Sequence, residues 1–269
     1  MHAYTCAFAR TLGAALVGTC AIAAAAAAES TITVTAIGPP PAAAEASAVA
    51  PALVPTSPTN LVGQSIRPGG VVLLWRDRST NESSFIVEGK LASDPAFSQL
   101  GTVSANVTAV TINGLPAGSD LLFRVRASNA SGASGSTNAV AVTTLATSGC
   151  VAADNAMCLQ NGEFRVQALF ITQDATGADG PSGEARAVKL VSDSGYLWFF
   201  NDSNIEAVVK VLNGCAINSR FWVFAGGLTN VRVVLTVTDT VAGASESYSN
   251  PQSHAFQPIQ DTEAFATCN

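Results

Sequence analysis

Few side chains in this sequence could do chemistry. It holds two histidines, and His2 lies at the extreme N-terminus, so any Ser-His-Asp arrangement would depend on His254. That residue ends the loop-like sequence Asn-Pro-Gln-Ser-His, which predicts an exposed histidine. No nucleophile elbow, zinc-peptidase motif, phosphate-binding glycine loop or dinucleotide fingerprint occurs. We therefore predict no catalytic residue, no enzyme activity and no cofactor. A hydrolase with an unrecognised site is the remaining catalytic alternative.

The acidic side chains are scattered, and most of them lie in predicted turns. Turn aspartates usually accept hydrogen bonds from their own backbone, whereas a paired-carboxylate hydrolase needs two acids facing one cleft. Calcium binding is the more specific alternative to a turn role for Asp193, Asp202 or Asp239, because hard oxygen ligands in loops suit that ion. No Asp-x-Asp-x-Asp spacing occurs, so we predict no metal site. The turn aspartates are Asp174, Asp179, Asp193, Asp202, Asp239 and Asp261.

The cysteines predict disulfides. Of six cysteines, two lie in the first 20 residues and four lie in the second half of the chain: Cys150, Cys158, Cys215 and Cys268. An even number in an exported chain implies pairing, and four cysteines allow three connectivities. We favour Cys150–Cys158 and Cys215–Cys268. The second pair would close a loop of about 50 residues and contribute on the order of 4 kcal/mol. The absence of a Cys-x-x-Cys motif argues against zinc.

An aromatic run from Tyr196 to Phe200 is the best candidate for a binding surface. In a strand, Tyr196, Trp198 and Phe200 share one face, while Leu197 and Phe199 share the other. Both faces are then apolar, although a sandwich strand normally buries one. The run Phe221–Phe224, which contains Trp222, has the same two-faced character. The candidate ligand-binding residues are Tyr196, Trp198 and Trp222.

Something must cover the second apolar face of these strands. We predict that the C-terminal tail does so, pinned by the Cys215–Cys268 disulfide and supplying Phe256, Ile259 and Phe265. Trp198 and Trp222 would then be mostly buried. Two alternatives stay open: a glycan platform, with a sugar stacked on Trp198 or Trp222, and an interface with a partner protein.

The N-terminus predicts export. Residues 1–28 combine one positive charge, Arg10, with an apolar run from Leu12 to Ala28 and small residues before Glu29, as in a secretory signal peptide. A lipoprotein signal ending at Cys20 is the alternative. No later segment has roughly 18 uninterrupted apolar residues, so we expect a secreted, periplasmic or extracellular protein without membrane insertion. A net charge of −6 without a basic cluster argues against nucleic acid.

Strand patterns fill most of the remaining chain. Residues 29–56 are rich in Ala, Pro and Ser and predict a linker, in which the strand-like Thr31–Thr35 is short and isolated. Short strands at a spacing of about ten residues then predict an immunoglobulin-like sandwich over 57–145. The strands are expected at 59–64, 70–76, 84–91, 98–103, 107–112, 120–128 and 138–144.

A second, disulfide-containing sandwich is predicted over 150–269. The segment 205–212 could also form a short helix, but its β-branched residues and the following Asn-Gly favour a strand. The fold class is thus all-β, with two β-sandwich domains that only Leu145–Gly149 would join, so we expect them to unfold separately. The strands are expected at 163–172, 184–191, 195–200, 205–212, 220–225, 230–238 and 244–248.

Residues 57–144 resemble a fibronectin type III domain. The resemblance rests on Trp75 at the end of an apolar run, the alternating Phe85–Glu88, and a block that contains Leu115, Gly118 and Phe123–Ala127. It implies a module that binds, spaces or presents, with Trp75 buried between two sheets. Leu121 stands where the family usually has a tyrosine, so the tyrosine-corner hydrogen bond is expected to be missing. No Arg-Gly-Asp occurs, so integrin adhesion is not implied.

The second half resembles a C-terminal domain of exported bacterial proteins that has no established activity. Together the two resemblances imply an exported bacterial protein that acts as a non-catalytic binding or interaction module for a protein or glycan ligand. An accessory carbohydrate-binding protein of an extracellular hydrolytic system is the alternative. The residues that carry the second resemblance are Cys158-Leu159, Gly162–Val166, Ser194–Phe200, Val209–Gly214, Phe221–Phe224 and Thr236–Thr240.

Overall fold

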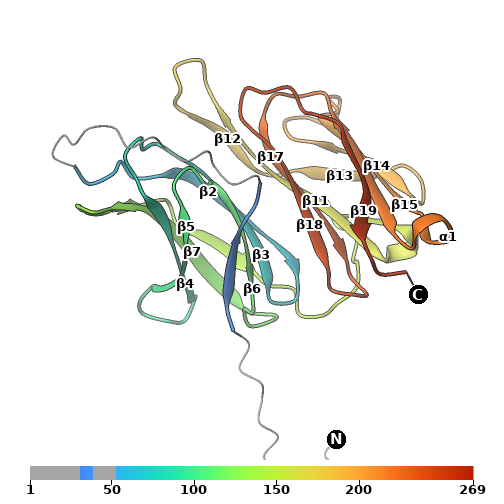
Figure 1. The fold of residues 1–269 in the computed structure, drawn as a ribbon, viewed down its shortest axis with the longest axis horizontal. Coiled ribbons are helices and arrows are strands. Elements are labelled where there is room, and N and C mark those ends of the chain that lie inside the picture. The colour runs from blue at the N-terminus through green and yellow to red at the C-terminus, as the bar shows by residue number, and fades with distance from the viewer. Residues whose placement is uncertain (1–30, 39–52, 269) are drawn as a thin grey trace, which may run out of the picture.

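The computed structural model describes residues 31–38 and 53–268. The predicted signal peptide (1–28), with Cys6 and Cys20, lies outside the described residues. The described chain forms 19 strands in two sandwiches, which confirms the predicted all-β fold (Figure 1). Helical structure in this part of the chain consists of η1 (Gln160–Gly162) and α1 (Cys215–Asn218). Neither is long or apolar enough to cross a membrane, and no other helix is described.

The first sandwich packs a four-stranded sheet on a five-stranded sheet. All neighbouring strands within them are antiparallel. The first sheet has the order β1 (Thr33–Ala36), β6 (Ala109–Asn113), β3 (Gly70–Arg76) and β2 (Thr59–Arg67). The second has the order β5 (Ser98–Ser104), β4 (Ser84–Leu91), β7 (Asp120–Asn129) and β8 (Gly132–Ser136), with β9 (Val140–Thr143) also on β7.

The alternating strands place the predicted residues in the core between these sheets. Trp75 is fully buried, and its ring meets Phe85 edge-on with the centroids 5.6 Å apart. Phe123 and Val125 on β7 point into the same core, and so does Leu121, the residue at the position of the missing tyrosine. The expected burial of Trp75 is therefore confirmed.

Strand β1 corrects the linker prediction. It lies within residues 29–56 and pairs with β6 from Thr33 opposite Asn113 to Ala36 opposite Val110. The side chain of Val34 packs on the core of the first sandwich and lies over Gly101, where a Cβ atom would approach it to 2.8 Å. The strand looked isolated in sequence because its partner lies far along the chain.

The second sandwich packs two five-stranded sheets. The predicted strand at 205–212 is confirmed, whereas β10, β12 and β19 were not predicted. One sheet has the order β10 (Met157–Leu159), β11 (Phe164–Gln173), β17 (Arg232–Asp239) and β18 (Ser245–Asn250), with β12 (Asp179–Glu184) also on β11. The other has the order β13 (Arg186–Lys189), β14 (Ser194–Trp198), β15 (Ala207–Asn213), β16 (Phe221–Gly227) and β19 (Ile259–Phe265).

The disulfides pair as predicted, Cys150 with Cys158 and Cys215 with Cys268. The second bridge ties α1 to the residues that follow β19. Phe265, the last residue of β19, is thereby held in the core, where its ring lies 5.1 Å from that of Phe164.

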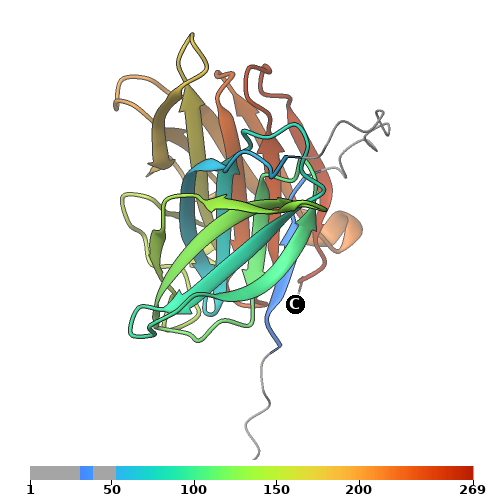
Figure 2. The same ribbon diagram turned by 90° about the vertical axis from the view of Figure 1, so that its left-hand side faces the viewer.

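The two sandwiches share a third apolar core, which corrects the prediction that only Leu145–Gly149 joins them. Strands β3 and β11 are buried on both faces: one face of each lines its own sandwich, and the other meets the neighbouring sandwich. Figures 1 and 2 show β2 and β3 of the first sandwich against the β11–β17 sheet of the second. The shared core consists of Ile66, Val72, Leu74 and Ala109 from the first sandwich and Leu169, Ile171 and Val234 from the second.

Polar contacts surround this shared core. Arg76 forms an ion pair with Asp179 (3.1 Å), and the Thr59 hydroxyl donates to the same carboxylate (3.0 Å). At another point of the interface, Arg67 donates from Nη1 to the carbonyl oxygen of Gly243 (2.9 Å). The four sheets therefore form one stack, in which the inner two sheets are covered on both sides.

Because the core is shared, the two sandwiches should unfold together. Truncation of Leu74 to alanine should cost about 2–5 kcal/mol of unfolding free energy, the range for fully buried leucines. Calorimetry should show one transition that moves to lower temperature as a whole. Val208→Ala, at a half-exposed position, is the control and should change it little. Two transitions, of which Leu74→Ala moves one, would contradict the shared core.

The two disulfides should differ in their effect on stability. Replacing both Cys215 and Cys268 with serine removes a 53-residue closure and should cost about 4 kcal/mol, whereas the same change at Cys150 and Cys158, 8 residues apart, should cost about 2.5 kcal/mol. Denaturant unfolding measures both. Since the sandwiches share a core, each change should lower the stability of the whole stack. A larger loss from the short-loop pair would contradict this ranking.

Candidate binding face of the second sandwich

The outer face of the β13–β14–β15–β16–β19 sheet presents the predicted aromatic residues. Leu197 and Phe199 point inward and are buried, whereas Tyr196 and Trp198 point outward and are half-buried. The predicted alternation is thus confirmed from Tyr196 to Phe199, but not for Phe200. Phe200 lies beyond the end of β14, where its ring packs edge-on against Phe170 at 5.6 Å between centroids.

Trp222 lies apart from the other two candidate residues. Tyr196 is opposite Val208 on β15, whereas Trp222 on β16 is opposite Leu212, about 13 Å further along the strand direction. The indole of Trp222 lies over the backbone of Gly214, and its Nε1 donates to Asn218 Oδ1 at 2.8 Å. The structure brings Tyr196 and Trp198 together but places Trp222 elsewhere, so the three form no single stacking platform.

The tail does not cover this face, so the lid prediction is wrong. Residues 259–265 form β19, which extends the sheet beside β16 with Ile259 opposite Ala225 and Gln260 opposite Phe224. In that position the tail pairs with backbone groups at the edge of β16 that would otherwise lack partners. Phe265 and Phe256 consequently pack on the inner core. Trp198 and Trp222 are half-buried rather than mostly buried.

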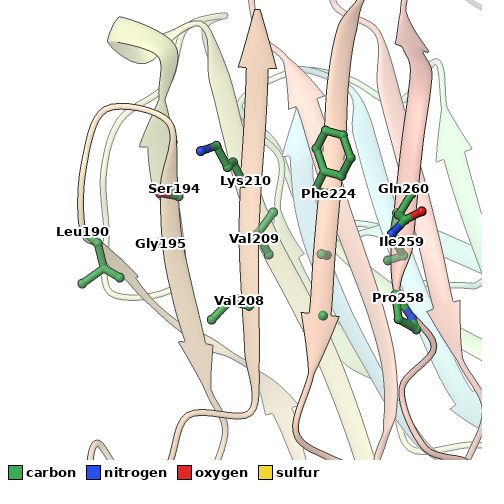
Figure 3. Close-up of a pocket in the computed structure, with 12 residues that line it drawn as sticks. Leu190, Ser194, Gly195, Val208, Val209, Lys210, Phe224, Pro258, Ile259 and Gln260 are labelled. Carbon is green, nitrogen blue, oxygen red and sulfur yellow. The ribbon is translucent and has the colours of Figure 1, made fainter.

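A shallow apolar groove of about 440 Å³ crosses the outer face of this sheet (Figure 3). Its floor includes Val208, which is 46% exposed, and Gly226, which lies opposite Val208 in the sheet and leaves the floor low. Leu190 stands at one side, Pro258 at the other, and Phe224 lies between them. A volume of this size falls within the range of ligand sites, roughly 300–1,000 Å³.

The groove residues were missed at the sequence level. The alternation of 205–212 already puts Val208 and Lys210 on the outward face, so that signal was present. The contribution of Pro258 to Gln260 depends on β19, which was not predicted.

Few polar groups line this groove. The Lys210 ammonium group is already paired with the Asp193 carboxylate, with an N–O distance of 3.4 Å. The same carboxylate accepts a hydrogen bond from the Ser194 hydroxyl, with an O–O distance of 2.9 Å. The remaining polar side chain at the rim is Gln260. The groove can therefore bind apolar groups, but it offers no acid–base pair for catalysis.

The other candidate residues take local structural roles. His254 is exposed, as predicted, and its Nδ1 lies 2.9 Å from the carbonyl oxygen of Gln252. Asp174 accepts hydrogen bonds from the Thr176 hydroxyl and from the backbone N–H groups of Thr176 and Ala178. These bonds confirm a turn role and lower the pKa of its carboxyl group.

The proposed calcium ligands are separated and mostly engaged. Asp239 is fully buried and accepts the backbone N–H groups of Val241 and Ala242, each at 2.9 Å. Asp193 is held by Lys210. Within residues 31–38 and 53–268, no three His, Cys, Asp or Glu side chains gather to hold a metal.

The opposite end of the four-sheet stack has a different surface. On the outer face of the β5–β4–β7–β8 sheet, Glu88 lies 2.6 Å from Arg124 and 3.9 Å from Arg126. The guanidinium group of Arg124 lies 4.3 Å from the ring centroid of Phe97. The outer face of the β5–β4–β7–β8 sheet thus carries ion pairs. The outer face at the other end of the stack exposes the apolar side chains of the groove.

No family model matches the sequence, and no curated protein matches it. Similar solved structures include domains of titin (23% identity, 34% of this chain, 32% of that chain, TM-score 0.32) and the fibronectin type III domain of human fibronectin type III domain containing protein 3 (21%, 36%, 93%, TM-score 0.31). Another is the FN1–FN3 fragment of chicken CNTN1 (12%, 74%, 100%, TM-score 0.33). The match thus spans about a third of the titin fragment. With TM-scores of 0.31 to 0.33, these likenesses carry no conclusion about this chain.

A substitution at Gly214 tests the packing of the Trp222 indole against the backbone there. The backbone of Gly214 (φ −99°, ψ 13°) suits any residue, but a methyl group there would overlap the indole ring. Gly214→Ala should displace Trp222, shift its fluorescence emission to the red and cost about 1–3 kcal/mol. Gly226→Ala, where a methyl group meets nothing within 4 Å, should change neither. Unaltered emission and stability in Gly214→Ala would refute this packing.

Proposed function

We propose that this protein is an exported, non-catalytic binding protein whose second sandwich holds an apolar segment of a partner protein on its outer sheet face. The observation that supports this most is the open apolar groove formed by Val208, Phe224, Gly226 and their neighbours. Monomeric proteins usually cover such patches or use them for binding. In this protein, packing covers the inner sheets on both faces. The outer face of the β13–β14–β15–β16–β19 sheet, at one end of the stack, remains uncovered.

The face of the sheet, rather than its edge, suits a partner. Edge strands attract added strands unless proline or charge protects them. The edge strand β19 follows Pro258 and carries Asp261 and Glu263, and Glu263 is paired with Arg220 at 3.1 Å. This edge is therefore protected, whereas the face beside it is apolar.

The scarcity of polar groups favours a protein segment over a glycan. Sugars are held by many hydrogen bonds as well as by stacking, but Lys210 is already paired with Asp193 and the Trp222 indole N–H is already bonded. The accessory carbohydrate-binding alternative rests on Tyr196 and Trp198, which stand side by side on the outer face of β14. Both point outward and are half-buried.

Export is supported by the two disulfides, because such bonds persist mainly in oxidising compartments. The predicted signal peptide at 1–28 and the resemblance of 150–269 to a domain of exported bacterial proteins point the same way. In this proposal the first sandwich acts as a rigid support that is packed against the back of the binding sandwich.

A groove-filling variant tests the proposal. Gly226→Val adds a side chain into open space on the groove floor, so the fold should persist while the groove becomes shallower. A displayed peptide library, panned on the intact protein, should yield apolar peptides whose binding weakens at least about tenfold in Gly226→Val. Val241→Ser removes another exposed apolar side chain and should leave binding unchanged.

The same protein should be applied to a glycan array. If glycans bind, if their binding is lost on replacing Trp198 with alanine and if no peptide is enriched, the carbohydrate alternative replaces the proposal. Enriched peptides that bind Gly226→Val as well as the intact protein would also overturn it, because the groove would then have no part in binding.

A further inference from the structure

A second cavity lies beside the groove, where β15 begins and β16 ends. It has a volume of about 700 Å³ and is lined by the segments that connect β14 to β15, β16 to β17 and β18 to β19. Gly226 of the groove floor is followed directly by Gly227 of the cavity, and Glu206 of the cavity precedes Val208 of the groove by two residues, about 7 Å along an extended chain. The two sites are therefore neighbours.

Glu206 brings an open carboxylate oxygen to this cavity. The residue is 4% exposed, and it forms no ion pair with any described residue. Asn204 Nδ2 donates a hydrogen bond to Glu206 Oε1. Glu206 Oε2 accepts no hydrogen bond from the described part of the chain, yet it is not enclosed in the way that the unpaired Trp75 Nε1 is. This oxygen keeps accessible surface, and a negative charge withdrawn from water in this way favours a cation as partner.

The other walls of the cavity suit the same kind of ligand. Glu206 is the one charged residue that lines it. Asn230 and Ser253 add exposed polar side chains that form no hydrogen bond within the described residues, so their oxygen atoms can accept one from a ligand. Phe200, which is 45% exposed, and Phe256 add aromatic rings. Aromatic and apolar walls next to a carboxylate suit a cation on an aliphatic stem.

The state of the carboxylate favours an ammonium group over other cations. A guanidinium group prefers to bind both oxygens of a carboxylate at once, but Asn204 already donates to Glu206 Oε1. An ammonium group is a compact charge that can donate to a single oxygen. Calcium needs six or more oxygen ligands, roughly, and within residues 31–38 and 53–268 no three His, Cys, Asp or Glu side chains gather.

We propose that this cavity binds a lysine side chain of the partner segment that the groove holds. The ammonium group donates to Glu206 Oε2, and the methylene stem lies against Phe200 and Phe256. This inference rests on the proposed function, because one segment would place apolar residues in the groove and its lysine in the adjoining cavity. It adds the chemistry of the partner, which is an apolar segment with a lysine beside it. A net charge of −6 would attract such a basic partner.

A pair of matched small probes tests the cavity without the groove. N-acetyl-lysine amide carries only the side-chain ammonium charge, and N-acetyl-norleucine amide has the same stem without it. Titration of the intact protein at constant ionic strength should shift the backbone amide signals of Gly227 and Leu228 saturably with the lysine probe, with a midpoint in the millimolar range typical of so small a ligand. Equal responses to both probes, or no saturable response to the lysine probe, would overturn the proposal.

Two variants separate the open oxygen of Glu206 from general attraction to a negative protein. Glu206→Gln keeps an oxygen that can accept from Asn204 and should weaken the lysine probe at least about tenfold. Asp202→Asn removes the same charge from an exposed position of the neighbouring loop, outside the cavity, and should change binding less than about twofold. An equal loss in both variants would overturn the site, because general electrostatic attraction would then explain the binding.

Peptides panned on the intact protein distinguish this inference from the proposed function. Enriched peptides should carry a lysine beside their apolar residues and should bind at least about tenfold more weakly to Gly226→Val and to Glu206→Gln. Peptides that are weakened by Gly226→Val alone would overturn the lysine site and leave the groove as proposed. If the lysine probe binds but no peptide depends on the groove, the proposed function fails and a free amine replaces the partner's lysine as the occupant.

Discussion

The packing of β3 against β11 and β17 determines how the rest of the molecule is arranged. Val72 and Leu74 of the first sandwich are buried in one apolar cluster with Leu169 and Val234 of the second. Burial of apolar side chains contributes roughly 1.5–3 kcal/mol each, so this contact is far stronger than a flexible joint would provide. Two sandwiches that could have moved on a short hinge become four stacked sheets.

Stacking divides the sheet faces into covered and free ones. The inner sheets lose both faces to packing, which leaves the two end faces for solvent or partners. One end face carries the ion pairs of Glu88 with Arg124 and Arg126. The other carries the groove around Val208 and Phe224.

Local patterns predicted the elements well because local interactions determine them. Alternation put Leu197 and Phe199 on the face opposite Tyr196 and Trp198, Trp75 marked the first core, and the cysteines led to the observed pairs. Strands β1 and β19 were missed or misassigned because their partners lie far away in sequence, and pairing there depends on tertiary contacts.

The shared core had a sequence signal that was interpreted too narrowly. The runs Val71–Trp75 and Ala168–Ile171 are apolar at consecutive positions, and such runs indicate strands buried on both faces. We applied that reasoning to Tyr196–Phe200, where the second face proved half-open, but not to these two runs, where it is closed. No periodicity in one strand tells which neighbour will cover its second face, so the binding face could not be assigned from the sequence.

The central claim is that both sandwiches form one rigid stack that leaves the groove face free. Residual dipolar couplings of backbone amides test it most directly, because they report the orientation and relative motion of each sandwich. The stack predicts that one alignment tensor fits the amides of both sandwiches. Two tensors that differ in magnitude or orientation from the arrangement described would contradict it.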